Sequence, residues 1–263
     1  MPTASLNNSK SGPSDSKVHP RSATISAAST NKKRSKQKTA SVILLAVVSI
    51  WVIYRGVVLP WFRNWGATPV EVVRALPGDE LIPANPMLAM NHAITIDAPP
   101  EKIFPYFVQL GQDRAGFYSY DWLERLCGFG IYNTYSIKPE WQSLKAGDFI
   151  TFIRQGMGMR VASVDPGKTI VLITDSRDRG HQLPPEKWEF FPVPTGKYVA
   201  WNWIFHVEKL PDGKTRVYSR SYTNWTNTNP FLNFALANAF ELPSEIMDRK
   251  MLLTIKKMAE QGR

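Results

Sequence analysis

The sequence predicts an α+β protein in which an antiparallel sheet wraps around a long C-terminal helix, preceded by a disordered basic tail and one transmembrane helix. Three observations predict this architecture. An apolar run, Ala40 to Tyr54, directly follows a cluster of Lys and Arg residues. Residues 148–225 repeatedly alternate apolar and polar side chains, which is the period of strands. From Pro230 to Gly262 the apolar residues instead follow the helical period.

The basic residues are concentrated in the tail. Residues 1–38 carry eight Lys or Arg and one acid, Asp15, whereas the rest of the chain carries 24 basic and 21 acidic residues. A nucleic-acid-binding domain would spread its basic residues over a folded face, where they displace counterions from phosphates. The charge distribution therefore argues against nucleic acid as a partner. The Ser-, Asn- and Lys-rich composition predicts that residues 1–38 are disordered.

The next segment, residues 39–62, is predicted to cross a membrane. The apolar run Ala40 to Tyr54 has 15 residues, which is short for a span of about 20 residues. Continuing to Phe62 gives 23 residues, provided that Arg55 extends its aliphatic stem toward the headgroups. Pro60 would end the helix, and aromatic residues would then lie at the interface: Trp61, Phe62 and Trp65.

Three other interpretations of the apolar run Ala40 to Tyr54 remain open. A cleaved secretory signal has the same order, but the long tail and the lack of a small-x-small site argue against cleavage. A mitochondrial presequence would also be Ser-rich and poor in acidic residues, as this tail is. A buried core helix is the third alternative, but a helix that is apolar on every side would need apolar partners on every side. Five Lys or Arg precede the run within seven residues, against Arg55 and Arg63 after it. For a span, the N-terminus is therefore expected in the cytoplasm and the C-terminal domain on the outer side.

Residues 63–89 are predicted to be a linker, because prolines and a glycine interrupt every period there. The remaining residues, 90–263, have the length of one domain. It begins with a strand, His92 to Ile96, followed by a helix from Pro100 to Leu110 and a short helix after Ser119. Further strands are expected at residues 148–154, 160–164, 169–174, 187–191, 198–209 and 215–225.

The final helix is expected to break at Pro243. Its second piece has an apolar stripe made of Ile246, Met247, Met251, Leu252, Ile255 and Met258. One such helix is about enough to cover the concave face of a single sheet, and a cavity is expected between the two.

Several segments resemble the START-like superfamily, also called SRPBCC, which includes polyketide cyclases and lipid-transfer domains. They read AITIDAPPEKIFPYFVQLGQ (93–112), RAGFYSYDWLE (114–124), KAGD (145–148) and IMDRKML (246–252). The segment LPGDELIP (76–83) is similar to the membrane-anchored bacterial branch of that superfamily. The resemblance covers residues 66–262 and implies a helix-grip fold with a cavity. It implies no particular chemistry, because the superfamily shares a cavity and not a catalytic set.

The lining of the expected cavity follows from the strand after Tyr198. Alternation places Val199, Trp201, Trp203, Phe205 and Val207 on one face, which is too bulky to be left in water. For the next strand the inward face stays open, although the long arginines favour an outward position for Arg216 and Arg220. The predicted ligand-binding residues are Arg114, Tyr118, Tyr120, Trp122, Trp188, Trp201, Trp203 and Phe205. Core packing is the alternative for the tryptophans, and ion pairs with Asp121 and Glu124 for the polar residues.

No motif for metal, phosphate or nucleophilic catalysis occurs in the sequence. His92, His181 and His206 are not spaced as metal ligands and are expected to be structural or surface residues. No catalytic residue, cofactor or metal is therefore assigned. The expected function is membrane-tethered binding of a hydrophobic small molecule or lipid. Two alternatives are a cyclase- or dehydratase-like enzyme that uses Tyr118, Tyr120 and Asp121 for proton transfer, and an interaction domain without a ligand.

Overall fold

The computed structural model describes residues 21–126, 128–153, 156–178, 196–226 and 229–262. The chain divides into two compact units, Met1–Tyr54 and Arg55–Arg263. The first unit contains α1 (Arg21–Ile53), so the described part of the expected disordered tail is helical. The helical stretch Lys36–Arg63 is long and apolar enough to cross a membrane, by length and composition. It includes a π-helical turn, η1 (Tyr54–Val58), and α2 (Leu59–Arg63).

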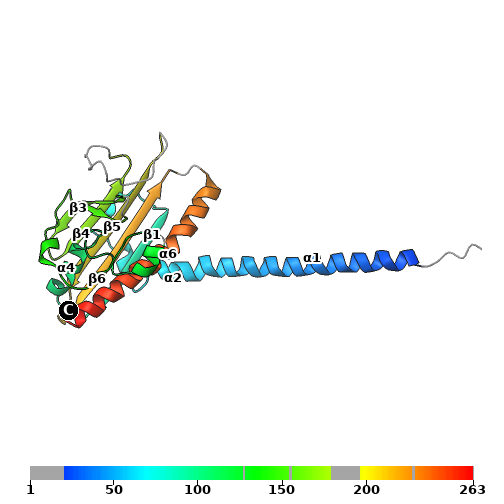
Figure 1. Cartoon of the computed structure of the whole chain (residues 1–263), viewed down its shortest axis with the longest axis horizontal. Helices are drawn as coiled ribbons and strands as arrows, with labels where there is room; N and C mark the ends of the chain where they lie inside the picture. The colour runs from blue at the N-terminus through cyan, green and yellow to red at the C-terminus, as the bar shows by residue number, and fades with distance from the viewer. Residues whose placement is uncertain (1–20, 127, 154–155, 179–195, 227–228, 263) are drawn as a thin grey trace, which may run out of the picture. The chain divides into compact units, whose positions relative to one another are not determined.

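The second unit is built on an open antiparallel sheet of six strands among the described residues (Figure 1). The strand order is β1-β6-β5-β4-β3-β2. The strands are β1 (Leu88–Ile96), β2 (Phe149–Thr151), β3 (Gly158–Asp165), β4 (Thr169–Asp175), β5 (Val199–Lys209) and β6 (Thr215–Trp225). Together with the C-terminal helix they confirm the predicted α+β class. The strand predicted at residues 187–191 lies outside the described residues.

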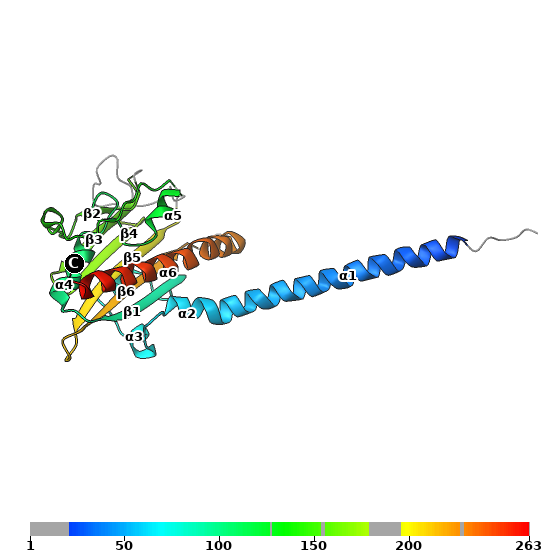
Figure 2. The same ribbon diagram turned by 60° about the horizontal axis from the view of Figure 1, so that its bottom comes forward.

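The sheet is accompanied by the helices α4 (Pro100–Val108), α5 (Asp121–Leu126) and α6 (Pro230–Glu260). Figure 2 shows α6 lying across one face of the sheet, which we call the inner face. The predicted break at Pro243 is wrong, because α6 continues through this residue. A proline inside a helix removes one hydrogen bond at a cost of about 3 kcal/mol. The buried contacts that α6 makes with the sheet offset this cost.

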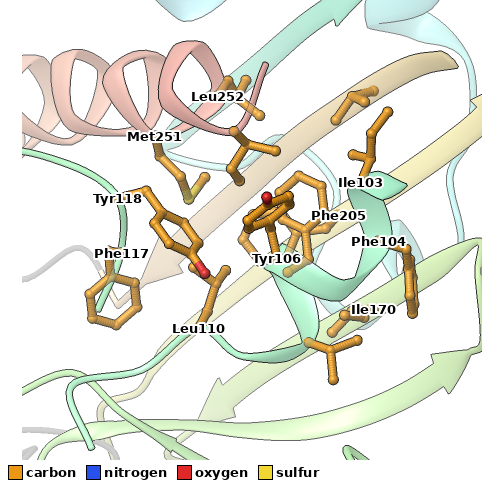
Figure 3. Close-up of a cluster of buried hydrophobic side chains, with 14 of the residues drawn as sticks. Ile103, Phe104, Tyr106, Leu110, Phe117, Tyr118, Ile170, Phe205, Met251 and Leu252 are labelled. Atoms are coloured by element: carbon orange, nitrogen blue, oxygen red, sulfur yellow. The ribbon is translucent and has the colours of Figure 1, made fainter. Parts of the chain in front are cut away.

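The inner face and the second half of α6 enclose a continuous apolar core (Figure 3). Phe205 and Val207 of β5 are buried in it, as the alternation predicted. The ring of Phe205 stacks on that of Phe107 from α4, with centroids 4.8 Å apart. From α6 the core receives Met251, Leu252, Ile255, Met258 and Ala259.

The opposite, outer face of the sheet is covered by residues 66–82, which the sequence predicted to be part of a linker. This segment contains α3 (Pro69–Val73) and a short 3-10 turn, η2 (Asp79–Leu81). Leu76 packs with Val171 and Ile204 of the outer face, and Ile82 packs with a neighbouring apolar cluster. The segment does not behave as a free tether, because the outer face is also apolar and needs a cover.

Arg220 of β6 fastens this cover. Its side chain is buried, and it donates hydrogen bonds to the backbone oxygens of Glu71 and Arg74, both at 2.7 Å, and to Asp79 Oδ2 at 2.6 Å. Arg216 pairs with Glu71 at 2.8 Å. The arginine face of β6 therefore points outward, as the long side chains favoured, but it is buried beneath the segment. Ser219 and its neighbours on the other face point toward α6.

The edge of the sheet at β1 is covered as well. Ala93 donates its backbone N–H to the oxygen of Trp65 at 3.1 Å. Gly66 has a φ of 73°, and a Cβ there would lie 2.1 Å from the oxygen of Ala93, so the close approach requires glycine. Leu59 of α2 is also buried, at 1% exposure. The end of the candidate span is thus part of the folded unit. Deleting residues 1–65 would therefore remove Leu59 from the core of that unit.

Candidate functional site

At the Val199 end of β5 the inner face is not sealed. Trp201 and Trp203 are only partly buried, and they pack with Phe117 and Phe152. The indole N–H of Trp201 donates to Ser221 Oγ at 2.7 Å, and that of Trp203 donates to Ser219 Oγ at 3.0 Å. Because both polar groups are satisfied within the sheet, the indoles offer apolar ring surface.

The elements around this end also expose apolar side chains. Strand β6 ends at Trp225, opposite Val199, and α6 starts five residues later, so the start of α6 lies near the open end of the inner face. The exposed apolar residues of α5, the loop after it and α6 include Trp122, Leu126, Phe129, Tyr132, Phe231, Phe234 and Phe240. We call the buried Phe117 together with the partly buried Phe152, Trp201 and Trp203 the aromatic groove.

Tyr118 does not lie at a mouth of this groove. It is fully buried, and Figure 3 shows its ring within the core beside Met251 of α6. Its hydroxyl accepts a hydrogen bond from Gln109 Nε2 at 2.6 Å. Burial raises the pKa of the Tyr118 phenol. The side chain therefore has a structural contact and is poorly placed to exchange protons.

The other predicted site residues lie apart. Arg114 donates to the backbone oxygen of Val108 at 3.3 Å, and Tyr120 lies under the ammonium of Lys250 from α6, at 5.7 Å. Asp121 pairs with Arg125 at 2.7 Å within α5. Trp122 is 59% exposed. Trp188 lies outside the described residues. The structure thus places Trp201 and Trp203 next to each other on β5, beside the buried Phe205. Among the described contacts, Arg114, Tyr118 and Tyr120 do not contact one another.

Glu124 of α5 is a buried carboxyl that sequence reasoning paired with an arginine. In the described part of the chain neither of its oxygens has a hydrogen-bond partner. Burial raises its pKa to about 7, and the nearby Asp121 adds to this rise while Arg125 opposes it. A buried acid without a partner penalises the folded state when it ionises.

We expect Glu124→Gln to remove a pH dependence of stability. The folded pKa of about 7 lies above the unfolded value of 4.5, so the penalty is absent below pH 4.5 and complete above pH 7. The shift corresponds to about 3 kcal/mol. In chemical unfolding of the full chain in mild detergent, the variant should match the wild type in acid and exceed its stability by about 2–3 kcal/mol in weak base. Glu140→Gln, at an exposed residue, is the control; equal differences at both pH values would contradict the prediction.

The most charged part of the interior lies on α6 and was missed by the sequence reasoning. Glu241, Glu245 and Asp248 are buried, at 3–4% exposure. Their spacing continues the stripe that Leu252 and Ile255 occupy, so these acids take apolar positions of the helix. This spacing was the signal available in the sequence. Ile246, predicted to belong to the stripe, is 36% exposed instead.

Three cations meet these three acids. His92 of β1 lies between two carboxylates, with Nδ1 2.7 Å from Asp248 and Nε2 2.8 Å from Glu245. Its Nε2 also lies 2.7 Å from the backbone oxygen of Phe62. Arg63 pairs with Glu241, and Arg55 lies 3.5 Å from the same carboxylate. We call these six residues the charged cluster.

The charged cluster keeps His92 protonated. Burial disfavours its charged form, but the contacts with Asp248 and Glu245 prevail and raise its pKa to about 10. An imidazolium donates from both nitrogens and cannot accept a proton. Ser219 donates its hydroxyl to Asp248 at 2.6 Å and not to His92, so the cluster does not activate this serine. Within the described residues, no group of three or more His, Cys, Asp or Glu is placed to hold a metal ion.

A second hollow lies between the sheet and its outer cover. It is lined by Ala67, Glu71, Asn91, His92, Tyr218 and Arg220, and it is too narrow to admit a water molecule. It is therefore a packing gap and not a ligand site.

No family model matches the chain, and no curated protein matches it. Similar solved structures include protein MLL2253 from Mesorhizobium loti, with 15% identity, coverage of 66% of this chain and 98% of that chain, and a TM-score of 0.33. The Aha1 dimer from Colwellia psychrerythraea is 20% identical, with coverage of 67% and 98% and a TM-score of 0.31. Hypothetical protein jhp0584 from Helicobacter pylori is 13% identical, with coverage of 74% and 99% and a TM-score of 0.39. Each of these TM-scores is below 0.5, so the similarities establish neither a family nor a function for this chain.

Proposed function

We propose that this chain is a membrane-tethered domain of the START-like, helix-grip type that binds one hydrophobic small molecule or lipid. The tether is the helical stretch Lys36–Arg63, with the N-terminus in the cytoplasm and the folded domain on the outer side. The binding site is the aromatic groove at the Val199 end of the inner face.

One observation carries this proposal. Under the second half of α6 the inner face contributes Phe205, Val207 and Val217 to the buried core, yet at its other end two tryptophans and Phe152 are left partly open. Small-molecule sites are concave and mostly apolar, with a few polar groups that fix orientation. The groove has this composition, since the hydroxyls of Ser219 and Ser221 are its nearest polar groups. An open aromatic groove beside a packed core favours a guest molecule over a filled interaction domain.

The enzyme alternative has less support. Its proposed proton donors are already engaged, Tyr118 with Gln109 and Asp121 with Arg125. His92 is held as a cation between two carboxylates. No described contact brings an acid and a base together in the aromatic groove, so binding is the function that the geometry supports best.

Native mass spectrometry of the full chain released from lipid nanodiscs tests the proposal. We expect one lipid or one small apolar molecule to stay bound per chain after the surrounding lipid is stripped. The full chain is required because residues 55–65 belong to the folded unit. Release of only ligand-free chains, in a preparation whose circular dichroism shows a folded domain, would overturn binding.

The matched variants are Trp201→Ala and Trp141→Ala. Both remove a partly buried indole that packs against the same core, but only Trp201 belongs to the aromatic groove. We expect Trp201→Ala to lower the retained fraction of bound molecule by about tenfold, which corresponds to 1.4 kcal/mol of lost contact. Trp141→Ala should retain the bound molecule as the wild type does. Equal losses in both variants would point to general destabilisation and count against the groove.

A further inference from the structure

The first part of α6, Pro230–Phe240, contains no charged residue and reads PFLNFALANAF. Its aromatic side chains are exposed: Phe231 by 79%, Phe234 by 45% and Phe240 by 59%. Phe231 and Phe234 are three residues apart and therefore lie on the same side of the helix. Exposed apolar surface of this kind marks a contact with a partner or a membrane.

This part of α6 is fixed beside the end of the candidate span. Glu241 follows Phe240 directly, and it is buried in contact with Arg63 and Arg55. Helix α2 packs against α6 within the same folded unit. The ion pairs therefore hold the uncharged turns of α6 next to residues 55–63.

The length of the span indicates which partner covers this surface. Residues from Arg55 onward belong to the folded unit, which leaves the 15 apolar residues Ala40 to Tyr54 outside it. At 1.5 Å per residue they extend about 22 Å, against a hydrocarbon core of about 30 Å. The shortfall is met when the folded unit is drawn against the bilayer, so that exposed Val57 and Trp61 enter the interface.

We infer that Pro230–Phe240 is a second membrane contact, which lies in the lipid interface beside the end of the span. A helix whose apolar side faces lipid is buried by about 5–10 Å at the boundary between headgroups and acyl chains. Lipid is the occupant that the surface fits, because its neighbours on the candidate span are apolar and exposed in the same way. The inference concerns docking of the domain and does not depend on a molecule in the aromatic groove.

Site-directed spin labelling of the full chain in phosphatidylcholine vesicles tests this contact. A nitroxide is attached at Phe234→Cys, or at the small exposed neighbour Ala235→Cys in case the first variant does not fold, in a Cys127→Ser background. The control site is Val73→Cys on α3, an apolar residue that is 82% exposed. We expect the ratio of collisions with oxygen to collisions with a water-soluble nickel chelate to be several-fold higher at residues 234 and 235 than at residue 73.

Two outcomes would overturn the inference. Nickel collisions at residues 234 and 235 that equal those at residue 73 would mean that this face is in water. Exclusion of both reagents with dipolar broadening between labels would mean that a second copy of the chain covers it. Neither outcome affects retention of a bound molecule in native mass spectrometry, so failure here is distinct from failure of the proposed function.

Discussion

Replacing His92 with Gln is expected to lower the free energy of unfolding by about 3–5 kcal/mol at neutral pH, since removing one partner from a buried ion pair leaves the other charge uncompensated. Here two carboxylates, Glu245 and Asp248, would lose their cation while they stay buried on α6. The bond to the oxygen of Phe62 would be weakened as well, so β1, α2 and α6 would all loosen. Thermal or urea unfolding of the full chain in mild detergent measures the effect.

The pH dependence gives a more specific readout for His92. Its folded pKa of about 10 lies above the unfolded value of 6.5. A raised pKa of this sign stabilises the fold fully below pH 6.5, and the contribution is lost as the pH rises toward 10. The stability difference between wild type and His92→Gln should therefore narrow from neutral pH to pH 10.

His206→Gln is the matched control for this experiment. His206 is also a buried strand histidine, but it contacts Thr169 Oγ1 at 2.8 Å, and burial lowers its pKa, so it is neutral. We expect a loss of about 1 kcal/mol, as for one neutral hydrogen bond, with no narrowing in base. If His92→Gln and His206→Gln lower the free energy of unfolding by the same amount, the ion pairs of His92 in the charged cluster do not stabilise the fold.

Arg220→Leu is expected to cost a similar 3–5 kcal/mol and to release the cover of the outer face. The variant removes four hydrogen bonds to residues 71–79 and leaves the partly buried Asp79 carboxylate without its cation. Hydrogen exchange of the backbone amides in residues 66–82 should speed up strongly, while β4 and β5 remain protected. Limited proteolysis should cut the variant first within this segment.

Arg74→Leu provides the comparison, because Arg74 lies within residues 66–82 and forms its ion pair at the surface. Arg74 pairs with Glu208 at 2.7 Å, but both side chains are more than 40% exposed. Surface pairs of this kind contribute about 0–1 kcal/mol. An Arg74→Leu variant as unstable as Arg220→Leu would show that burial does not decide the strength of these contacts.

Local patterns were sufficient for most of the second unit. The alternation of residues 215–225 gave a strand with the bounds that the structure has, and the bulky face of β5 turned inward. Such patterns succeed because a strand between water and core must alternate along its own sequence. The shared inner face of Trp201, Trp203 and Phe205 could be predicted for the same reason, since the three residues alternate along one strand.

Contacts between distant segments were not accessible in this way. Residues 63–89 were predicted to be a linker because of their prolines. In the structure, however, Leu76 and Ile82 pack on β4 and β5, more than 80 residues away in the sequence. The proximity of Arg114 and Tyr118 in the sequence likewise did not determine that one side chain binds a backbone oxygen and the other enters the core.

The sequence by itself determined the α+β class, the candidate span and the inward face of β5, because each of these depends on the period or length of a single segment. Only the tertiary structure decided the charged cluster, the cover of the outer face and the position of the first turns of α6. These features depend on pairing between a carboxylate or an apolar residue and a partner far away in the chain. A buried acid such as Glu245 is unfavourable until folding supplies its cation, and no local pattern states which cation that will be.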